Sequence, residues 1–110
     1  MQNWQKLGCV FQTAPNIESW NQRGYAAVPV SIAVEGGRRV FYSARDSKGR
    51  SRIGAFDFDP ASPKDSLKHI AGPILSPGNI GTFDEAGTMA TELIQWQGRW
   101  LLYYIGWNLG

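Results

Sequence analysis

The sequence is poor in the residues that form covalent links or bind metals. Cys9 is the only cysteine, so no disulfide can form within the chain. His69 is the only histidine, and without a second imidazole or a partner for Cys9 the pattern predicts no zinc site. We expect no metal and no cofactor, with His69 in a strand and Cys9 in the apolar core.

Charge and long apolar runs are also scarce. Charged residues make up 18% of the 110 residues and the net charge is +2 at pH 7, which is too little to indicate nucleic acid as a partner. No window suggests a membrane span, and the first residues lack the apolar core of a signal peptide. We therefore expect no membrane partner and a cytoplasmic location, with a secreted parent that has lost its leader as the alternative. The sequence shows no phosphate-binding glycine loop, nucleophile-elbow motif or amphipathic helix.

What the chain does contain is aromatic residues and a repeat. Its five Trp, four Tyr and five Phe are spread along the sequence, which is typical of β-rich folds and of surfaces that stack on ligands. The segment Gly37–Tyr42 recurs 61 residues later as Gly98–Tyr103. Each copy is an apolar run, a glycine-containing turn and an alternating aromatic run, and a period of this size indicates an array of supersecondary units.

Hydrophobic alternation predicts about seven short strands joined by tight turns. The predicted strands are Gln5–Gln12, Ala26–Glu35, Arg38–Arg45, Ser51–Asp59, Leu67–Leu75, Met89–Trp96 and Arg99–Trp107. Ala26–Glu35 is mostly apolar, as in a strand buried on both faces. Its Pro29 must lie near the start of the strand or where no ladder hydrogen bond is needed. In Arg38–Arg45, the side chains of Val40, Tyr42 and Ala44 should point to one face and those of Phe41, Ser43 and Arg45 to the other.

This pattern predicts an all-β fold of antiparallel β-meander blades, with about four strands in each unit, as in part of a β-propeller. We expect a single domain over residues 1–110. It would consist of an N-terminal strand and loop (1–25), a first four-stranded blade (26–75) and an incomplete second blade (76–110).

Several segments together resemble a known group of proteins. They are Val28–Val30, Tyr42–Asp46, Gly49–Gly54, Gly81–Gly87 and Leu102–Asn108. In combination they look like the N-terminal one and a half to two blades of the five-bladed β-propeller glycosidase-related proteins, a group that includes arabinanase-like and xylosidase-like enzymes, fructan hydrolases and mannoside phosphorylases. The resemblance implies a carbohydrate ligand at one mouth of a central channel. It also implies acidic residues near the innermost strands, where two carboxyl groups flank the scissile bond.

The same resemblance supplies candidate catalytic residues. Asp84, just before the innermost strand of the second blade, looks like the acidic residue that these families place there, and Glu85 is a second candidate. The alternative is a turn carboxylate that bonds its own backbone amides. The corresponding stretch of the first blade, Tyr25–Val28, has no carboxylate, and the general acid in such proteins usually comes from a later blade. The resemblance therefore implies that a lone chain of this length is inactive.

Arg45, Asp46, Arg52 and Trp107 are the candidate substrate-binding residues. Arg45 could hold a sugar through its planar guanidinium, and Trp107 could stack on a sugar face. In the alternative interpretation, Asp46 caps the turn, Arg45 and Arg52 take part in a cross-strand ion pair, and the late aromatic residues form cross-strand pairs.

Three functional hypotheses follow. The chain is a carbohydrate-binding or catalytically incomplete glycoside hydrolase relative, a non-enzymatic interaction protein that associates with itself, or an N-terminal fragment of a longer glycosidase. Fewer than two blades cannot close into a ring, so open edges and apolar faces predict a homo-oligomer, most simply a dimer. Exchange of the Gln5–Gln12 strand or of the last hairpin would be one route to it.

Overall fold

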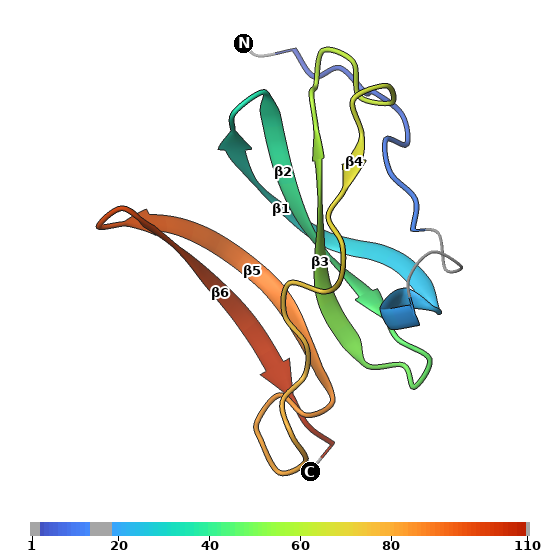
Figure 1. Cartoon of the computed structure of the whole chain (residues 1–110), viewed down its shortest axis with the longest axis vertical. Helices are drawn as coiled ribbons and strands as arrows, with labels where there is room; N and C mark the ends of the chain where they lie inside the picture. The colour runs from blue at the N-terminus through green and yellow to red at the C-terminus, as the bar shows by residue number, and fades with distance from the viewer. Residues whose placement is uncertain (1–2, 14–18, 110) are drawn as a thin grey trace.

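A computed structural model of the chain describes residues 3–13 and 19–109. This part of the chain contains one short 3-10 helix and six strands and no α-helix, which confirms the all-β prediction. The strands form one sheet in the order β1-β2-β3-β5-β6, with β4 paired to β3 (Figure 1). The elements are η1 (Ser19–Asn21), β1 (Gly24–Val34), β2 (Gly37–Arg45), β3 (Ser51–Phe58), β4 (Lys68–His69), β5 (Gly87–Trp96) and β6 (Arg99–Trp107).

The prediction of a strand over Gln5–Gln12 was wrong, as was the burial of Cys9. This segment contains no strand, and the Cys9 thiol is exposed. The segment contributes a side chain instead of a backbone ladder, because the Phe11 ring stacks on Phe56 with their centroids 4.2 Å apart. The chain therefore has six strands in its described part rather than about seven.

The predicted strand Leu67–Leu75 is reduced to β4 and one isolated bridge. β4 pairs with β3 through two residues, and Leu75 forms a separate bridge with Ile53. His69 lies in β4, which confirms its placement in a strand. Gly72 and Pro73 separate the two contacts, because proline lacks the amide needed to continue a ladder.

The sheet is mixed, whereas the sequence predicted an antiparallel meander. β3 and β5 run parallel where Ser51 pairs with Gly87. Beside this pair the Ser51 hydroxyl donates to the Thr88 carbonyl oxygen at 2.8 Å, and the Thr88 hydroxyl donates to the Ser51 carbonyl oxygen at 3.3 Å. Both residues are almost fully buried, so these bonds connect the β5–β6 hairpin to the rest of the sheet inside the protein.

The sequence repeat corresponds to two β-hairpins. β1 and β2 are joined by a turn at Glu35–Gly36, and β5 and β6 by a turn at Gln97–Gly98. Both residues of the second turn have positive φ, 49° and 75°, as a two-residue type I′ turn requires. When the turns are aligned, the structural offset is 62 residues. Tyr42 is therefore equivalent to Tyr104, and Phe41 to Tyr103.

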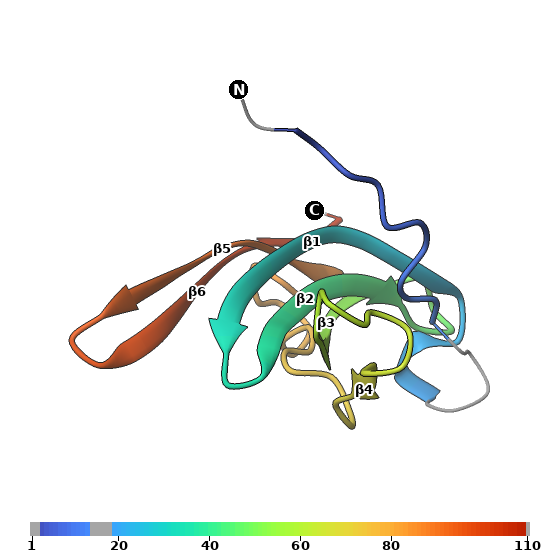
Figure 2. The ribbon, with the colours of Figure 1, turned by 90° about the horizontal axis from the view of Figure 1, so that it is seen from above.

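Two apolar clusters cover the two faces of the β1–β3 sheet, as the alternation in β2 predicted. On the Tyr42 face, the buried residues are Trp20, Val40, Tyr42, Ala44 and Phe56, with Phe11, Phe58 and Leu67 packed against them. On the Phe41 face, Ile32, Phe41, Ile53, Ala55 and Ala90 are buried, with Leu102 and Tyr104 among their neighbours. The β5–β6 hairpin therefore covers the Phe41 face, and its far end extends away from the sheet (Figure 2).

β1 differs from the strand buried on both faces that the sequence predicted. Most of its residues are exposed, because β1 is an edge strand that pairs only with β2. Its ladder is interrupted twice, between Gly24 and Ala27 and between Ala27 and Val30. Pro29 lies within the second irregularity, where no ladder hydrogen bond is required, as predicted.

Candidate functional site

A cavity of about 370 Å³ lies at the end of the sheet where β1 begins, β2 ends, and β3 and β5 begin. Its lining residues are Tyr25, Ala27, Ser43, Arg45, Ser51 and Met89. Ala27 and Ser43 are register partners, as are Arg45 and Ser51. The cavity is therefore built on strand backbone and not on a loose loop.

The Ser43 hydroxyl is the most unusual group in this cavity. Ser43 is only 3% exposed, and its hydroxyl oxygen has no hydrogen-bond partner among the residues that the structure describes. A buried hydroxyl without a partner costs free energy, so it calls for a functional or structural reason. By contrast, the Ser51 hydroxyl in the same cavity is bonded to Thr88.

The β1 backbone beside Ser43 is strained. Tyr25 has φ 68° and Val28 has φ 50°, a conformation that is costly for non-glycine residues and most costly for a β-branched one such as valine. These two residues flank Ala27, the register partner of Ser43. Tyr25 lines the cavity and is 65% exposed.

Arg45 is the cationic residue of the cavity. Its side chain is exposed, and one Nη donates to the Gly49 carbonyl oxygen at 2.8 Å. It forms no ion pair in the part of the chain that the structure describes, unlike the pairing considered from sequence. A guanidinium held by one carbonyl retains several N–H donors that can reach a ligand.

Asp46 and Arg52 are bonded to each other. The Asp46 carboxylate accepts hydrogen bonds from the amides of Lys48 and Arg50 at 3.0 and 2.9 Å, so it caps the turn as the alternative interpretation predicted. It also pairs with Arg50 and Arg52, with N–O distances of 3.0 and 3.1 Å. The Arg52 guanidinium donates further to the Ser76 hydroxyl at 2.8 Å. These residues fix the β2–β3 turn beside the cavity without lining it.

Asp84 is held by three hydrogen bonds. It is 7% exposed, and its carboxylate accepts from the Gly78 amide at 3.2 Å and from the hydroxyls of Thr82 and Tyr104 at 3.0 Å each. Burial opposes its ionisation, but hydrogen bonds from Thr82, Tyr104 and Gly78 outweigh that effect, so the pKa of Asp84 lies below its ordinary value. A general acid requires the opposite shift.

Glu85 and Trp107 occupy the same end of the β5–β6 hairpin. Glu85 accepts a hydrogen bond from the Gly81 amide at 2.8 Å, which is the turn-carboxylate role. The Trp107 ring packs over Gly87, where a Cβ atom would overlap it. Neither residue lines the cavity, so the structure does not bring together all the residues selected from sequence.

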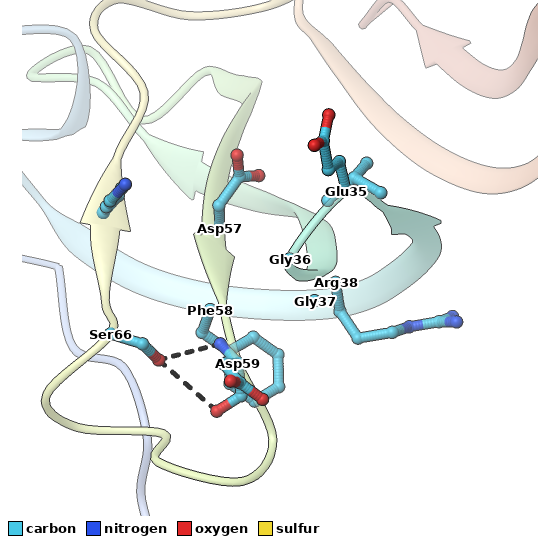
Figure 3. Close-up of a pocket in the computed structure, with 10 residues that line it drawn as sticks. Glu35, Gly36, Gly37, Arg38, Asp57, Phe58, Asp59 and Ser66 are labelled. Atoms are coloured by element: carbon cyan, nitrogen blue, oxygen red, sulfur yellow. Dashed lines mark hydrogen bonds between the residues drawn. The ribbon is translucent and has the colours of Figure 1, made fainter.

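A second hollow, of about 250 Å³, lies beside the β1–β2 turn (Figure 3). Its walls carry both signs of charge, including Arg38, Asp57 and Asp59. Asp57 is paired with Arg39 at 2.8 Å, and Asp59 caps the Ala61 amide at 2.9 Å. Two of its carboxylates are thus committed within the protein, and we regard the cavity beside Ser43 as the stronger site.

The described residues contain neither a metal-binding cluster nor a membrane-spanning helix. No group of three or more His, Cys, Asp or Glu side chains in residues 3–13 and 19–109 is arranged to hold a metal ion. Over the same residues, no helix has the length and apolar character to cross a membrane.

Two proteins of Mycobacterium tuberculosis are similar to this chain: the uncharacterized protein MT1551 of strain CDC 1551 / Oshkosh and the uncharacterized protein Rv1502 of strain ATCC 25618 / H37Rv. Each is 41% identical over 107 residues, a match that covers 96% of this chain and 35% of the relative. The chain thus spans about a third of the length of the curated relatives it matches. No family model and no solved structure matches it.

Proposed function

We propose that this protein binds a carbohydrate in the cavity beside Ser43. The observation that carries the proposal is the buried hydroxyl of Ser43, a residue of the cavity wall, which has no hydrogen-bond partner in the described part of the chain. A sugar hydroxyl can both donate and accept, so it would satisfy this group when bound. Because a site that leaves a buried polar group unpaired strongly favours a ligand that pairs it, the hydroxyl would also select against apolar ligands.

The neighbours of Ser43 suit the same ligand class. The exposed ring of Tyr25 offers a flat surface for the apolar C–H face of a sugar. Arg45 offers planar N–H donors that can bond two neighbouring hydroxyls at once. A volume of about 370 Å³ lies at the small end of ligand-site volumes, so one or two sugar units are the appropriate size.

Binding without hydrolysis is the activity that we propose for the chain. None of the six residues that line the cavity carries a carboxylate, whereas glycoside hydrolysis uses two. The carboxylates of Asp84 and Glu85 are directed to donors of the 76–86 loop and to Tyr104. In this proposal, Asp84 and Glu85 position that loop.

The finer architecture that we propose is two successive blades of a propeller-like array. The Phe41 face of the β1–β2 hairpin packs against Leu102 and Tyr104 of the β5–β6 hairpin. These two residues are equivalent to Val40 and Tyr42 of the first hairpin. Opposite faces of equivalent hairpins thus meet, as they do when blades stack in one direction around an axis. This stacking supports a relationship to the propeller glycosidases.

Titration of arabinose, xylose and mannose into the full chain, monitored by NMR, tests the proposal. We expect Ser43→Ala and Arg45→Ala each to weaken binding of the preferred sugar at least about tenfold, which corresponds to about 1.4 kcal/mol. Ser43→Ala should leave stability unchanged or slightly higher, because it removes an unpaired buried hydroxyl. Ser47→Ala, in the exposed part of the turn, is the matched control. Absence of binding to all three sugars, or equal binding by Ser43→Ala, would refute the proposal.

A further inference from the structure

The β5–β6 hairpin has an exposed apolar face on the side opposite Tyr104. We call it the outer face, and its apolar members are Ile94, Trp96, Leu101, Tyr103 and Ile105. Ile94, Trp96, Tyr103 and Ile105 are between 41% and 54% exposed. Together they offer on the order of 400 Å² of apolar surface, within the range of the largest patches on monomeric proteins, which are often functional.

The outer face is equivalent to a face that is already covered elsewhere in the molecule. Tyr103 corresponds to Phe41 of the first hairpin, and Phe41 is buried beneath β5 and β6. In the first unit, the Tyr42 face, which could accept such a surface, is occupied by Phe11, stacked 4.2 Å from Phe56. A second copy of the chain therefore cannot offer its Tyr42 face without displacing Phe11, but it can offer its own outer face.

Two opposite charges lie within the outer face. Glu92 pairs with Tyr103 across the strands, and Arg99 pairs with Trp96, on either side of the Ile94–Leu101 pair. Both charged side chains are exposed, and neither has an ion-pair partner among the described residues.

We propose that the outer face is a self-association surface that binds the outer face of a second copy about a two-fold axis through the Ile94–Leu101 pair. This axis sets the Glu92–Tyr103 pair of one copy against the Trp96–Arg99 pair of the other, so each Glu92 comes within reach of the other copy's Arg99. In this arrangement each copy contributes the same apolar side chains to the interface, as an isologous interface requires. Each copy also pairs its Glu92 and its Arg99 with the opposite charge of the other copy. The far end of the hairpin extends away from the sheet (Figure 2), and the apolar side chains of the outer face are exposed or half-buried. The outer face of each copy supplies roughly half the area that one partner buries in a standard interface. We therefore expect a dimer dissociation constant in the micromolar range.

Charge exchange tests this geometry by sedimentation velocity over a wide range of protein concentrations. Glu92→Arg alone places the new arginine of each copy beside Arg99 of the other copy, so both charge contacts become repulsive. Arg99→Glu alone places two glutamates together at each contact, with the same effect. Each single variant should raise the dimer dissociation constant at least about tenfold. The double variant Glu92→Arg/Arg99→Glu exchanges both charges and should restore association to near the original value.

Lys64→Glu and Asp65→Arg, on an exposed loop outside the outer face, are the charge-matched controls, and near-ultraviolet circular dichroism verifies that each variant is folded. A monomeric parent chain at high micromolar concentration overturns the proposal. So does a dimer whose stability the single variants leave unchanged, since that result would indicate pairing through the free edge of β6 or another surface. Failure of the double variant to recover would refute the two-fold geometry.

Discussion

Replacing Asp46 by Asn should reveal how strongly one carboxylate stabilises the β2–β3 turn. The Asp46 side chain is 7% exposed and holds two backbone amides and two guanidinium groups. Asparagine has nearly the same shape and can keep its carbonyl oxygen toward the amides of Lys48 and Arg50. It has no charge, however, and its NH₂ group opposes the guanidinium groups of Arg50 and Arg52.

The size of the effect follows from the number and exposure of the lost bonds. Hydrogen bonds to charged groups contribute about 1.5–3 kcal/mol when buried. Here the side chains of Arg50 and Arg52 are 35% and 20% exposed, and solvent weakens such pairs. We therefore expect Asp46→Asn to lower the free energy of unfolding at pH 7 by about 1–2 kcal/mol, and Asp46→Ala by about 2–4 kcal/mol, since alanine also removes the cap of the turn.

The stabilisation by Asp46 should depend on pH in a defined direction. Burial raises the pKa of Asp46, but bonds from the Arg50 amide and the Arg52 guanidinium, with the charge of Arg50, lower it more, so its folded pKa lies below the ordinary value. As the pH falls, Asp46 is therefore protonated in the unfolded chain before it is protonated in the folded one. In the unfolded chain this occurs within about one pH unit of the ordinary pKa of about 3.9. The stabilisation is complete above about pH 5 and is lost as the pH falls through the folded pKa.

Urea unfolding followed by tryptophan fluorescence measures both effects. The difference in unfolding free energy between the parent chain and Asp46→Asn should be largest at pH 7 and should shrink progressively below about pH 4. Asp57→Asn removes a carboxylate from the more exposed pair with Arg39, so it should cost less at pH 7. A difference below about 0.5 kcal/mol at pH 7, or one that does not shrink in acid, would refute the assignment of Asp46 as the anchor of this turn.

Two further substitutions probe the core and the Asp84 site. Gly54→Ala should destabilise the protein by about 1–3 kcal/mol through overpacking, because the new Cβ atom would overlap the buried Trp20 ring; thermal unfolding measures this, and an unchanged melting temperature would contradict it. Tyr104→Phe removes the hydroxyl that donates to Asp84, so the pKa of Asp84 should rise toward its ordinary value. Carboxyl ¹³C NMR titration detects that shift, and an unmoved pKa would show that Gly78 and Thr82 are sufficient.

Local sequence patterns predicted the central strands because the alternation of side chains between the two faces of a strand can be read from neighbouring residues. Alternation in β2 and β3 placed Val40 and Phe41 on opposite faces, where the structure has them. The segment Gln5–Gln12 has similar apolar content but no partner strand, and pairing is decided by contacts distant in sequence that no local pattern records. The same limit applies to Leu67–Leu75, where only Lys68 and His69 enter the sheet as a strand.

The candidate site was less accessible to sequence reasoning than the fold. The alternation placed Ser43 and Arg45 on one face of β2, but nothing in the sequence shows that the Ser43 hydroxyl lacks a partner. Ser43 pairs with Ala27, which lies between the two irregularities of the β1 ladder, and the sequence pattern did not reveal these irregularities. Asp84 was selected from sequence as a candidate catalytic carboxylate. The structure shows which donors hold it, namely the Gly78 amide and the hydroxyls of Thr82 and Tyr104, and only the fold brings Tyr104 to it.

The identity of the outer face depends on a difference of one residue between two alignments of the repeat. The sequence repeat aligns Gly37 with Gly98, which makes Tyr103 the equivalent of Tyr42. Because the Phe41 face of the first hairpin packs on the Tyr42-equivalent face of the second, that alignment would bury Tyr103 and expose Leu102 and Tyr104. In the structure the turns are offset by one residue more than the glycines, so Tyr104 is buried against the Phe41 face and Tyr103 is exposed. Because strand side chains alternate with a period of two, such a slip exchanges every side chain between the faces. The surface available to a second copy is thus set by the geometry of the Gln97–Gly98 turn.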